Sequence, residues 1–210
     1  MKNMLFIMNP KAGRTTLKNS LVDVLEVFCN NDYAVRTYLT KSADDAERIV
    51  QEEGANYDVI VCAGGDGTLG NTVTGYMKSG IRVPLGYIPC GSTNDFARSM
   101  DIPRETVEAA EMIVKAEPFS IDIGSLNDKN FVYVAAFGMF SDTSYATPQN
   151  MKNIFGHAAY VLQGIKSLAN VPSYKMKVTI DGDEQEGEFI FGMVSNSVSV
   201  GGFKSITRKG

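Results

Sequence analysis

The sequence predicts an α/β protein whose first part is built on a mostly parallel sheet and whose second part is antiparallel. In the first half, short apolar runs alternate with segments of helical periodicity, which is the pattern of repeated strand–helix–strand units. In the second half, strand-like runs flank two loop signals, at residues 127–130 and 181–183, which is typical of hairpins. We place the boundary near Glu117-Pro118, so residues 1–118 form the first domain and residues 119–210 the second.

The first domain is expected to contain parallel strands with helices on both faces of the sheet. Its clearest strand, Asp58–Ala63, is uncharged after its first residue, rich in β-branched residues and followed by glycine. A strand of this kind is buried on both faces, as parallel strands are. The expected strands are residues 4–8, 35–39, 58–63 and 83–88, and the expected helices are residues 17–28, 43–53, 69–79 and 103–116.

The second domain is expected to contain two hairpins with a helix inserted between them. The segment Asp181-Gly182-Asp183 carries the Asp-Gly pair that favours a tight hairpin turn. Pro172 closes the helical pattern that comes before it. The expected strands are residues 120–126, 131–137, 174–180 and 186–195, and the expected helix is residues 151–169.

Composition and charge exclude several classes of protein. The 210 residues carry a formal net charge of −4 at pH 7, whereas a general nucleic-acid binder needs a basic face that meets phosphates. The N-terminal apolar run is too short for a signal peptide, and no run reaches the length of a bilayer span. Three widely spaced cysteines fit a reducing compartment. We therefore expect a cytoplasmic protein that does not bind nucleic acid.

The segment with the most chemistry is Ala63–Gly70, directly after the clearest strand and before a helix. Its glycines, Gly64, Gly65 and Gly67, let the backbone turn sharply and bring several N–H groups together. With the positive end of the following helix, this loop can hold a phosphate. Asp66 would repel a bare phosphate, but its carboxylate makes sense if Mg²⁺ lies between the two. The alternative is a tight strand–helix turn with an aspartate near the helix start.

Two other phosphate-binding patterns do not describe this loop. Residues Gly65–Gly70 match the dinucleotide pattern G-x-G-x-x-G, but that pattern also needs an acidic residue at the end of the next strand. Here the next strand ends at Ile88-Pro89-Cys90-Gly91, without an acidic residue. The ATPase pattern G-x-x-x-x-G-K-[ST] is absent from the chain.

Two further polar loops follow strands of the predicted parallel sheet. Asn9–Arg14 follows the first strand and Gly91–Arg98 follows the fourth, while Thr40 ends the second. The carboxyl ends of parallel strands meet at one edge, where open α/β sheets bind ligands. Each loop alone could be a turn with a helix cap, but three of them at one edge indicate a binding site.

These motifs resemble those of the diacylglycerol kinase catalytic domain, a family related to sphingosine kinases and more distantly to NAD kinases. The resemblance rests on Gly64–Leu69, on Asn9-Pro10-x-x-Gly13 and on Gly91–Ala97, and it extends to Lys152–Tyr160 and Ser195–Phe203. It implies a Rossmann-like domain, followed here by part of an antiparallel β-sandwich domain, with ATP between them. The ATP contacts that the resemblance implies are Asn9, Pro10, Lys11, Ala12, Gly13, Thr40, Gly65, Asp66, Gly67, Thr68, Leu69, Gly70, Asn71 and Ser92.

The resemblance further implies transfer of the γ-phosphate of Mg·ATP to the hydroxyl of diacylglycerol or a related lipid at the membrane surface. Asp66 would engage Mg²⁺, and Asp95 would lie near the transferring group or position the hydroxyl. The family usually continues its glycine loop with Asn-Glu, where this chain has Gly70-Asn71. That departure puts the contact at Asn71 in doubt and leaves Asp66 untouched.

Alternatives remain open at this point. An NAD kinase shares the Gly-Gly-Asp-Gly-Thr loop, and a non-catalytic nucleotide-binding fragment needs no general base. We expect only transient, peripheral contact with membranes, and homodimer formation is left open. Since the sequence stops soon after Gly201-Gly202-Phe203, where related proteins continue into further strands, we expect the 210-residue chain to bind ATP weakly without turning it over.

Overall fold

The structure is a computed structural model that describes residues 1–12, 16–138, 173–196, 199–200 and 203–204. It divides into two compact units, one made of Met1–Tyr133 with Ser195–Gly210 and the other of Val134–Val194. The helix expected at residues 151–169 lies outside the described residues. The predicted domain boundary at residue 118 stays a prediction.

The first unit is built on a four-stranded sheet in which all neighbouring strands are parallel, in the order β2-β1-β3-β4. This confirms the predicted fold class. Met4 of the central strand β1 lies opposite Val35 of β2 and Val59 of β3. The strands are β1 (Lys2–Met8), β2 (Tyr33–Leu39), β3 (Val59–Gly64) and β4 (Leu85–Pro89), and the helices are α1 (Thr16–Asn30), α2 (Asp45–Glu53), α3 (Asp66–Ser79), α4 (Asp95–Ser99) and α5 (Thr106–Lys115), with a short 3₁₀ turn at Gly54–Asn56.

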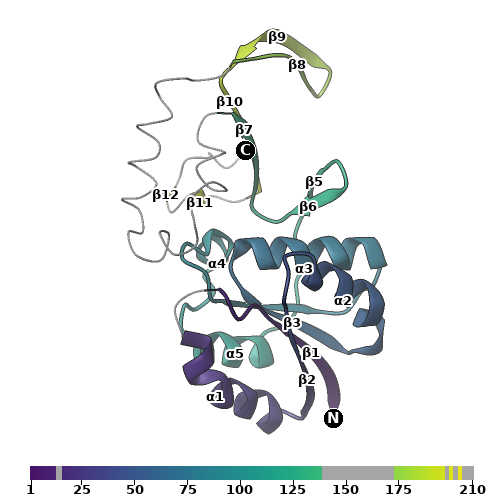
Figure 1. Cartoon of the computed structure of the whole chain (residues 1–210), viewed down its shortest axis with the longest axis vertical. Coiled ribbons are helices and arrows are strands. Elements are labelled where there is room, and N and C mark those ends of the chain that lie inside the picture. The colour runs from purple at the N-terminus through teal and green to yellow at the C-terminus, as the bar shows by residue number, and fades with distance from the viewer. Residues whose placement is uncertain (13–15, 139–172, 197–198, 201–202, 205–210) are drawn as a thin grey trace. The chain divides into compact units, whose positions relative to one another are not determined.

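Helices cover both faces of this sheet, as the buried strands require. Alternate residues of β1 point to opposite faces, so Met4 and Phe6 pack with α1 and α5, whereas Leu5 and Ile7 pack with α2. Phe6 meets Phe28 of α1 edge to face, with ring centroids 5.5 Å apart. Figure 1 shows α1 and α5 on one side of the sheet and α2 and α3 on the other. The sheet is thus the middle of three layers.

Helices α2 and α3 lie unusually close together because α3 carries a glycine at the contact. A Cβ placed on Gly75 would lie 2.4 Å from the carbonyl oxygen of Glu47. The Glu47 side chain is buried and forms ion pairs with Lys78 of α3 at 2.8 Å and with Lys129 of β6 (Lys129–Phe131) at 2.7 Å. One carboxylate therefore ties together three elements of the first unit.

The first predicted hairpin is shorter than expected. Strands β5 (Gly124–Leu126) and β6 are joined by the two residues Asn127 and Asp128, with Asn127 at φ 54°. The predicted strand 120–126 keeps only its last three residues, and the predicted strand 131–137 is divided between β6 and β7 (Val134–Gly138); Asn196 bonds beside both breaks. Its side-chain amide donates to the Asp122 carbonyl at 2.5 Å, and its backbone N–H donates to the Tyr133 carbonyl at 2.9 Å.

The second hairpin is confirmed with a changed outer end. Strands β8 (Tyr174–Ile180) and β9 (Asp183–Phe189) pair antiparallel around Asp181-Gly182, both at positive φ, 51° and 95°. An Asp-Gly pair at positive φ is what a type I′ turn requires. The predicted strand 186–195 is in fact two strands, β9 and β10 (Phe191–Ser195), and β10 pairs with β7 (Val134–Gly138) instead of continuing the hairpin. A further two-stranded ladder, β11 (Ser199–Val200) and β12 (Phe203–Lys204), belongs to the first unit.

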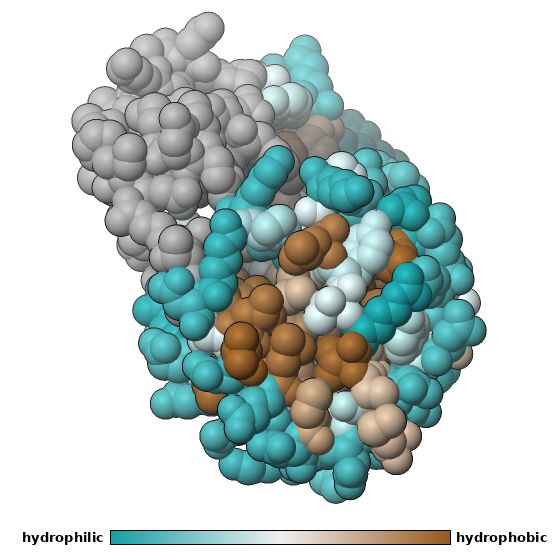
Figure 2. All heavy atoms as spheres, turned by 60° about the horizontal axis from the view of Figure 1, so that its bottom comes forward, coloured by the Kyte–Doolittle hydropathy of each residue, from teal (hydrophilic) through white to brown (hydrophobic). Residues whose placement is uncertain are grey.

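The surface of the described chain carries scattered apolar side chains, and in the first unit these include Val22 at 76% exposure and Leu39 at 55%. Figure 2 shows one face on which hydrophobic residues gather in one area within a hydrophilic surround. None of the described helices is long and apolar enough to cross a bilayer.

All three cysteines are free; Cys29 is exposed, whereas Cys62 and Cys90 are buried. Burial raises the pKa of both buried thiols to about 12.

Candidate functional site

The loops predicted to form the site follow β1, β2, β3 and β4, at the carboxyl edge of the parallel sheet. The strand order β2-β1-β3-β4 means that the chain moves from β1 to one side and from β3 to the other. The loops after β1 and β3 therefore diverge at this point, which is where open α/β sheets form a ligand-binding crevice. The predicted loops therefore lie at the switch point of the sheet.

The glycine loop is largely the first turn of α3, which begins at Asp66 and not at residue 69 as expected. The first helical hydrogen bond runs from the Leu69 amide to the Gly65 carbonyl at 3.1 Å. The amides of Asp66, Gly67 and Thr68 therefore lie at the N-terminal end of the helix, where no intrahelical partner exists for them. Such amides, together with the helix dipole, favour an anion.

Space is available directly above this turn. A Cβ placed on Gly67 would meet nothing within 4 Å, whereas a Cβ on Gly64 would lie 2.6 Å from the Thr68 side chain. Gly64 is therefore required by the tight turn itself, whereas no contact with the described residues requires Gly67. Its small size leaves the end of α3 accessible, which fits the binding of a phosphate close to the backbone.

Asn9 ties the loop after β1 to the glycine loop. Its side-chain amide donates to the Thr68 hydroxyl at 2.9 Å, and its side-chain oxygen accepts the Lys11 N–H at 2.9 Å. The backbone N–H of Asn9 donates to the Ala63 carbonyl at 2.9 Å. One residue thus closes its own turn and fixes the distance between the two loops of the crevice.

Asp66 ties the glycine loop to α4. Its two carboxylate oxygens accept the backbone N–H groups of Asp95 and Phe96 at 3.1 and 3.2 Å. The carboxylate therefore caps α4, a role that sequence reasoning did not foresee. A carboxylate has about four acceptor positions, so this one could still reach a cation. Burial raises the pKa of Asp66, while these backbone hydrogen bonds act in the opposite direction.

The glycine loop and the loop after β4 touch through their backbones. A Cβ on Gly91 would lie 2.6 Å from the Gly65 Cα, so no side chain fits between the two loops. Asp95, the first residue of α4, is 1% exposed. That burial favours a role in positioning neighbours over direct contact with a large substrate.

The loop after β2 is fixed by two side chains. Asp45 accepts the Lys41 and Ser42 N–H groups at 2.6 and 3.1 Å, and these bonds lower the pKa of Asp45 to about 2. The Asn71 side-chain amide donates to the Ala43 carbonyl at 2.8 Å. Asn71 thus holds the loop that follows Thr40. A glutamate at position 71 could not make this hydrogen bond, because an ionised carboxylate has no donor.

The remaining predicted contacts fall into different environments. Leu69 is 2% exposed and packs in the core with Cys62 and Val73, so only its backbone could reach a ligand. Ala12 packs partly against the core on the α1 side. Pro10, Lys11 and Ser92 are exposed, Thr40 is buried, Gly70 is half-buried in α3, and Gly13 lies outside the described residues. The individual ATP contacts stay predictions.

A magnesium ion would fit this site only if a bound nucleotide supplied phosphate oxygens as further metal ligands. Among the described residues there is no cluster of three or more histidine, cysteine, aspartate or glutamate side chains that could hold a metal. Mg²⁺ is commonly held by one or two carboxylates together with phosphate oxygens and waters. Asp66 beside the open end of α3 matches that mode, in which the ion shields phosphate charge from the carboxylate.

Two side chains of the site were missed by sequence reasoning. Tyr87 of β4 has its hydroxyl beneath both glycine loops, and Asn94 closes the turn after β4 with φ 52° and ψ 54°. A tyrosine within an apolar strand carries no signal that distinguishes it from an ordinary core residue. Asn94 could have been suspected, because asparagine is among the non-glycine residues that most readily adopt a left-handed turn conformation.

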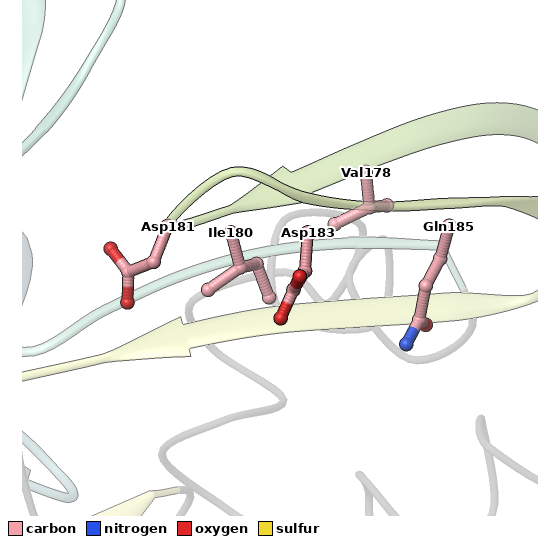
Figure 3. Close-up of a pocket in the computed structure, with 5 residues that line it drawn as sticks. All are labelled: Val178, Ile180, Asp181, Asp183 and Gln185. Atoms are coloured by element: carbon pink, nitrogen blue, oxygen red, sulfur yellow. The ribbon is translucent and has the colours of Figure 1, made fainter.

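A cavity of about 270 Å³ lies elsewhere, on one face of the β8–β9 hairpin (Figure 3). Its walls include the cross-strand pairs Val178–Gln185 and Ile180–Asp183, with Asp181 at the turn. The two carboxylates in this lining would repel a nucleotide phosphate. None of its residues belongs to the predicted site.

Fold and site together define the class of doubly wound α/β proteins with a glycine loop at the switch point of the sheet. The sequence also matches the family described as diacylglycerol kinase catalytic domain, over residues 3–126. It is 36% identical over 208 residues to the diacylglycerol kinase of Bacillus subtilis strain 168, covering 98% of this chain and 69% of that protein. With the diacylglycerol kinase of Staphylococcus aureus strain JH9 it shares 34% identity over 209 residues, covering 98% and 65%.

A comparison with solved structures points to the same family. A crystal structure of a putative diacylglycerol kinase from Bacillus anthracis strain Sterne superposes with a TM-score of 0.82 at 30% identity, covering 97% of this chain and 67% of that one. The chain belongs to the diacylglycerol kinase catalytic domain family. It spans about two thirds of the length of the relatives it matches.

Proposed function

We propose that this protein transfers the γ-phosphate of Mg·ATP to the hydroxyl of diacylglycerol or a closely related lipid. The observation that carries the proposal is the open first turn of α3. Asp66 and Thr68 in that turn are bonded to α4 and to Asn9, respectively. Membership of a kinase family supplies the reaction class, and the names of the relatives suggest the lipid.

In this reaction the lipid hydroxyl oxygen attacks the γ-phosphorus, the bond to the oxygen bridging the β- and γ-phosphates breaks, and ADP leaves. The hydroxyl proton passes to a base that we do not assign. The amides of Gly67 and Thr68, which have no partner within the helix, would hold phosphate oxygens, and Asp66 would hold Mg²⁺, which neutralises developing negative charge. The residues of the chain therefore act mainly by placing the reactants.

Asp95 contributes to this arrangement through its backbone and position at the start of α4. Because its N–H donates to Asp66 at 3.1 Å, α4 and the glycine loop must move together. The predicted role of Asp95 beside the transferring group is retained as part of the proposal. So are ATP and Mg²⁺ as cofactors and transient contact with the membrane surface.

The first experiment identifies the acceptor. The full-length protein is incubated with ATP labelled at the γ-phosphate and with diacylglycerol, sphingosine, phosphatidylglycerol or NAD, each in a separate reaction. We expect label in the lipid extract of the diacylglycerol reaction. Label in NAD alone would establish the NAD kinase alternative, and ATP binding without transfer to any acceptor would establish a non-catalytic nucleotide-binding protein.

The second experiment tests the phosphate position. Because nothing lies within 4 Å of a Cβ at Gly67, Gly67→Val should fold normally while its side chain fills the space above the α3 amides. We expect ATP binding, measured by titration calorimetry, to fall at least about tenfold. Met77→Val, which introduces the same β-branched side chain at an exposed position of α3, is the control. Normal ATP binding by Gly67→Val would show that the loop is only a turn.

A further inference from the structure

The hydroxyl of Tyr87 lies beneath the point where the two glycine loops meet. Tyr87 is 4% exposed, and its hydroxyl donates to the Gly64 carbonyl at 3.1 Å. The same hydroxyl oxygen is 3.4 Å from the side-chain oxygen of Asn94. Gly64 precedes the turn that begins α3, and Asn94 precedes α4, so one hydroxyl contacts both segments.

The two groups it contacts are themselves held by the backbone around them. The Gly64 carbonyl also accepts the Cys90 N–H at 2.7 Å. The Asn94 side chain accepts the Gly91 N–H and donates to the Gly91 carbonyl, both at 2.8 Å. Asn94 has left-handed backbone angles, which a non-glycine residue keeps only when its surroundings hold it there.

This network ends at the two carboxylate-bearing residues of the proposed site. Asp95 directly follows Asn94, and its N–H donates to Asp66 at 3.1 Å. A Cβ on Gly91 would lie 2.6 Å from the Gly65 Cα, so the loops are in backbone contact at this point. A shift of Asn94 would therefore change the placement of Asp95 relative to Asp66.

We propose that Tyr87 is a positioning residue, whose hydroxyl acts with Asn94 to fix the relative placement of Asp66 and Asp95. The catalytic part of this inference rests on the proposed kinase function, whereas the structural part does not. Small errors in the placement of reacting groups lower turnover strongly. Loss of the hydroxyl should therefore reduce kcat about tenfold and leave the KM for ATP within about twofold.

The test compares Tyr87→Phe with Tyr76→Phe in the full-length protein. The Tyr76 hydroxyl donates to the Val83 carbonyl at 2.8 Å, so both variants delete one hydroxyl bonded to a backbone carbonyl in the first unit. We expect similar losses of stability but a fall in kcat for Tyr87→Phe alone. Hydrogen exchange at the Asp95 and Phe96 amides should also accelerate only in Tyr87→Phe. Equal kcat values, or unchanged exchange at these amides, would overturn the inference.

Asn94→Gly supplies an independent second variant, because glycine keeps the left-handed backbone while the side chain is lost. If the two side chains act as one unit, the double variant should be no slower than the slower single variant. Multiplying effects would instead mean separate roles and contradict the proposal. A wild-type protein without phosphoryl transfer would refute the proposed function, and the exchange measurement would then decide the positioning role on its own.

Discussion

Gly75 offers the sharpest test of the packing between α2 and α3. In Gly75→Ala the new methyl group would lie 2.4 Å from the Glu47 carbonyl oxygen and 2.9 Å from its Cα. Both contacts are with backbone, so no change of side-chain rotamer can relieve them, and α2 must move. Gly70→Ala is the matched control, since it makes the same substitution in the same helix where a Cβ meets nothing within 4 Å.

The expected magnitudes follow from two opposing effects. Replacing glycine by alanine inside a helix stabilises the folded state by about 1 kcal/mol, whereas overpacking costs about 1–3 kcal/mol. The upper part of that range applies at Gly75 because backbone must move. We therefore expect Gly75→Ala to lower the free energy of unfolding by about 1–2 kcal/mol, and Gly70→Ala to raise it by about 0.5–1 kcal/mol.

Urea unfolding followed by far-UV circular dichroism measures both changes; the chain contains no tryptophan, so tryptophan fluorescence is not an option. With an m-value of about 2 kcal/mol per molar urea, the midpoints of the two variants should differ by about 1 M. Gly75→Ala with a midpoint equal to that of Gly70→Ala would refute the close α2–α3 contact. Gly70→Ala is used here for stability only, because Gly70 is also a predicted ATP contact.

Asp66→Asn should abolish the Mg²⁺ dependence of ATP binding. It should also lower the free energy of unfolding by about 1–3 kcal/mol, because an amide presents only one acceptor oxygen to α4. Calorimetry with and without Mg²⁺, paired with urea unfolding, tests both effects; an unchanged metal dependence would contradict the assignment. Hydrogen bonds from Lys129 and Lys78 lower the pKa of Glu47 in the folded state, so this group stabilises the protein above its unfolded-state pKa and loses that effect as pH falls through the folded-state pKa. Glu47→Gln should therefore be destabilising at neutral pH and nearly neutral in acid, and a pH-independent difference in unfolding free energy would count against the ion pairs. In vesicle co-sedimentation we expect weak binding to neutral lipid that rises with anionic lipid at low salt, whereas tight, salt-insensitive binding would reveal an apolar anchor.

The parallel sheet was predictable because its strands are buried on both faces and so are continuous apolar runs. β1 and β3 differ from their predicted bounds by two residues or fewer. The start of α3 was predicted three residues too late, at residue 69 instead of 66. Asp66 and Gly67 are poor residues for a helix interior, but the first turn tolerates glycine and favours an aspartate there.

The second half was harder to predict because its strands depend on distant partners. Nothing near residues 120–123 shows that the Asp122 carbonyl is bonded to the Asn196 side chain, 74 residues away. Without that contact, the apolar residues before Gly124 predict one long strand. Tight turns are a local property, and Asp181-Gly182 was located correctly for that reason.

For the candidate site, the sequence predicted which loops meet, but not how side chains hold them together. Glycine-rich segments after consecutive strands indicate a shared edge, since that follows from parallel topology. The capping of α4 by Asp66 and the anchoring of Ala43 by Asn71 depend on distances between loops. A pattern along the chain does not contain such distances.

The three free thiols provide a reporter of local opening that requires no engineering. Cys29 is exposed at the end of α1, whereas Cys62 and Cys90 are buried, and a pKa of about 12 keeps both buried thiols protonated and unreactive at neutral pH. An alkylating reagent should therefore modify Cys29 first. Cys90 lies between Pro89, the last residue of β4, and Gly91 of the proposed site. The rate at which Cys90 becomes alkylated thus measures how often the core beneath this loop opens, and a bound nucleotide that holds the loops together should slow it.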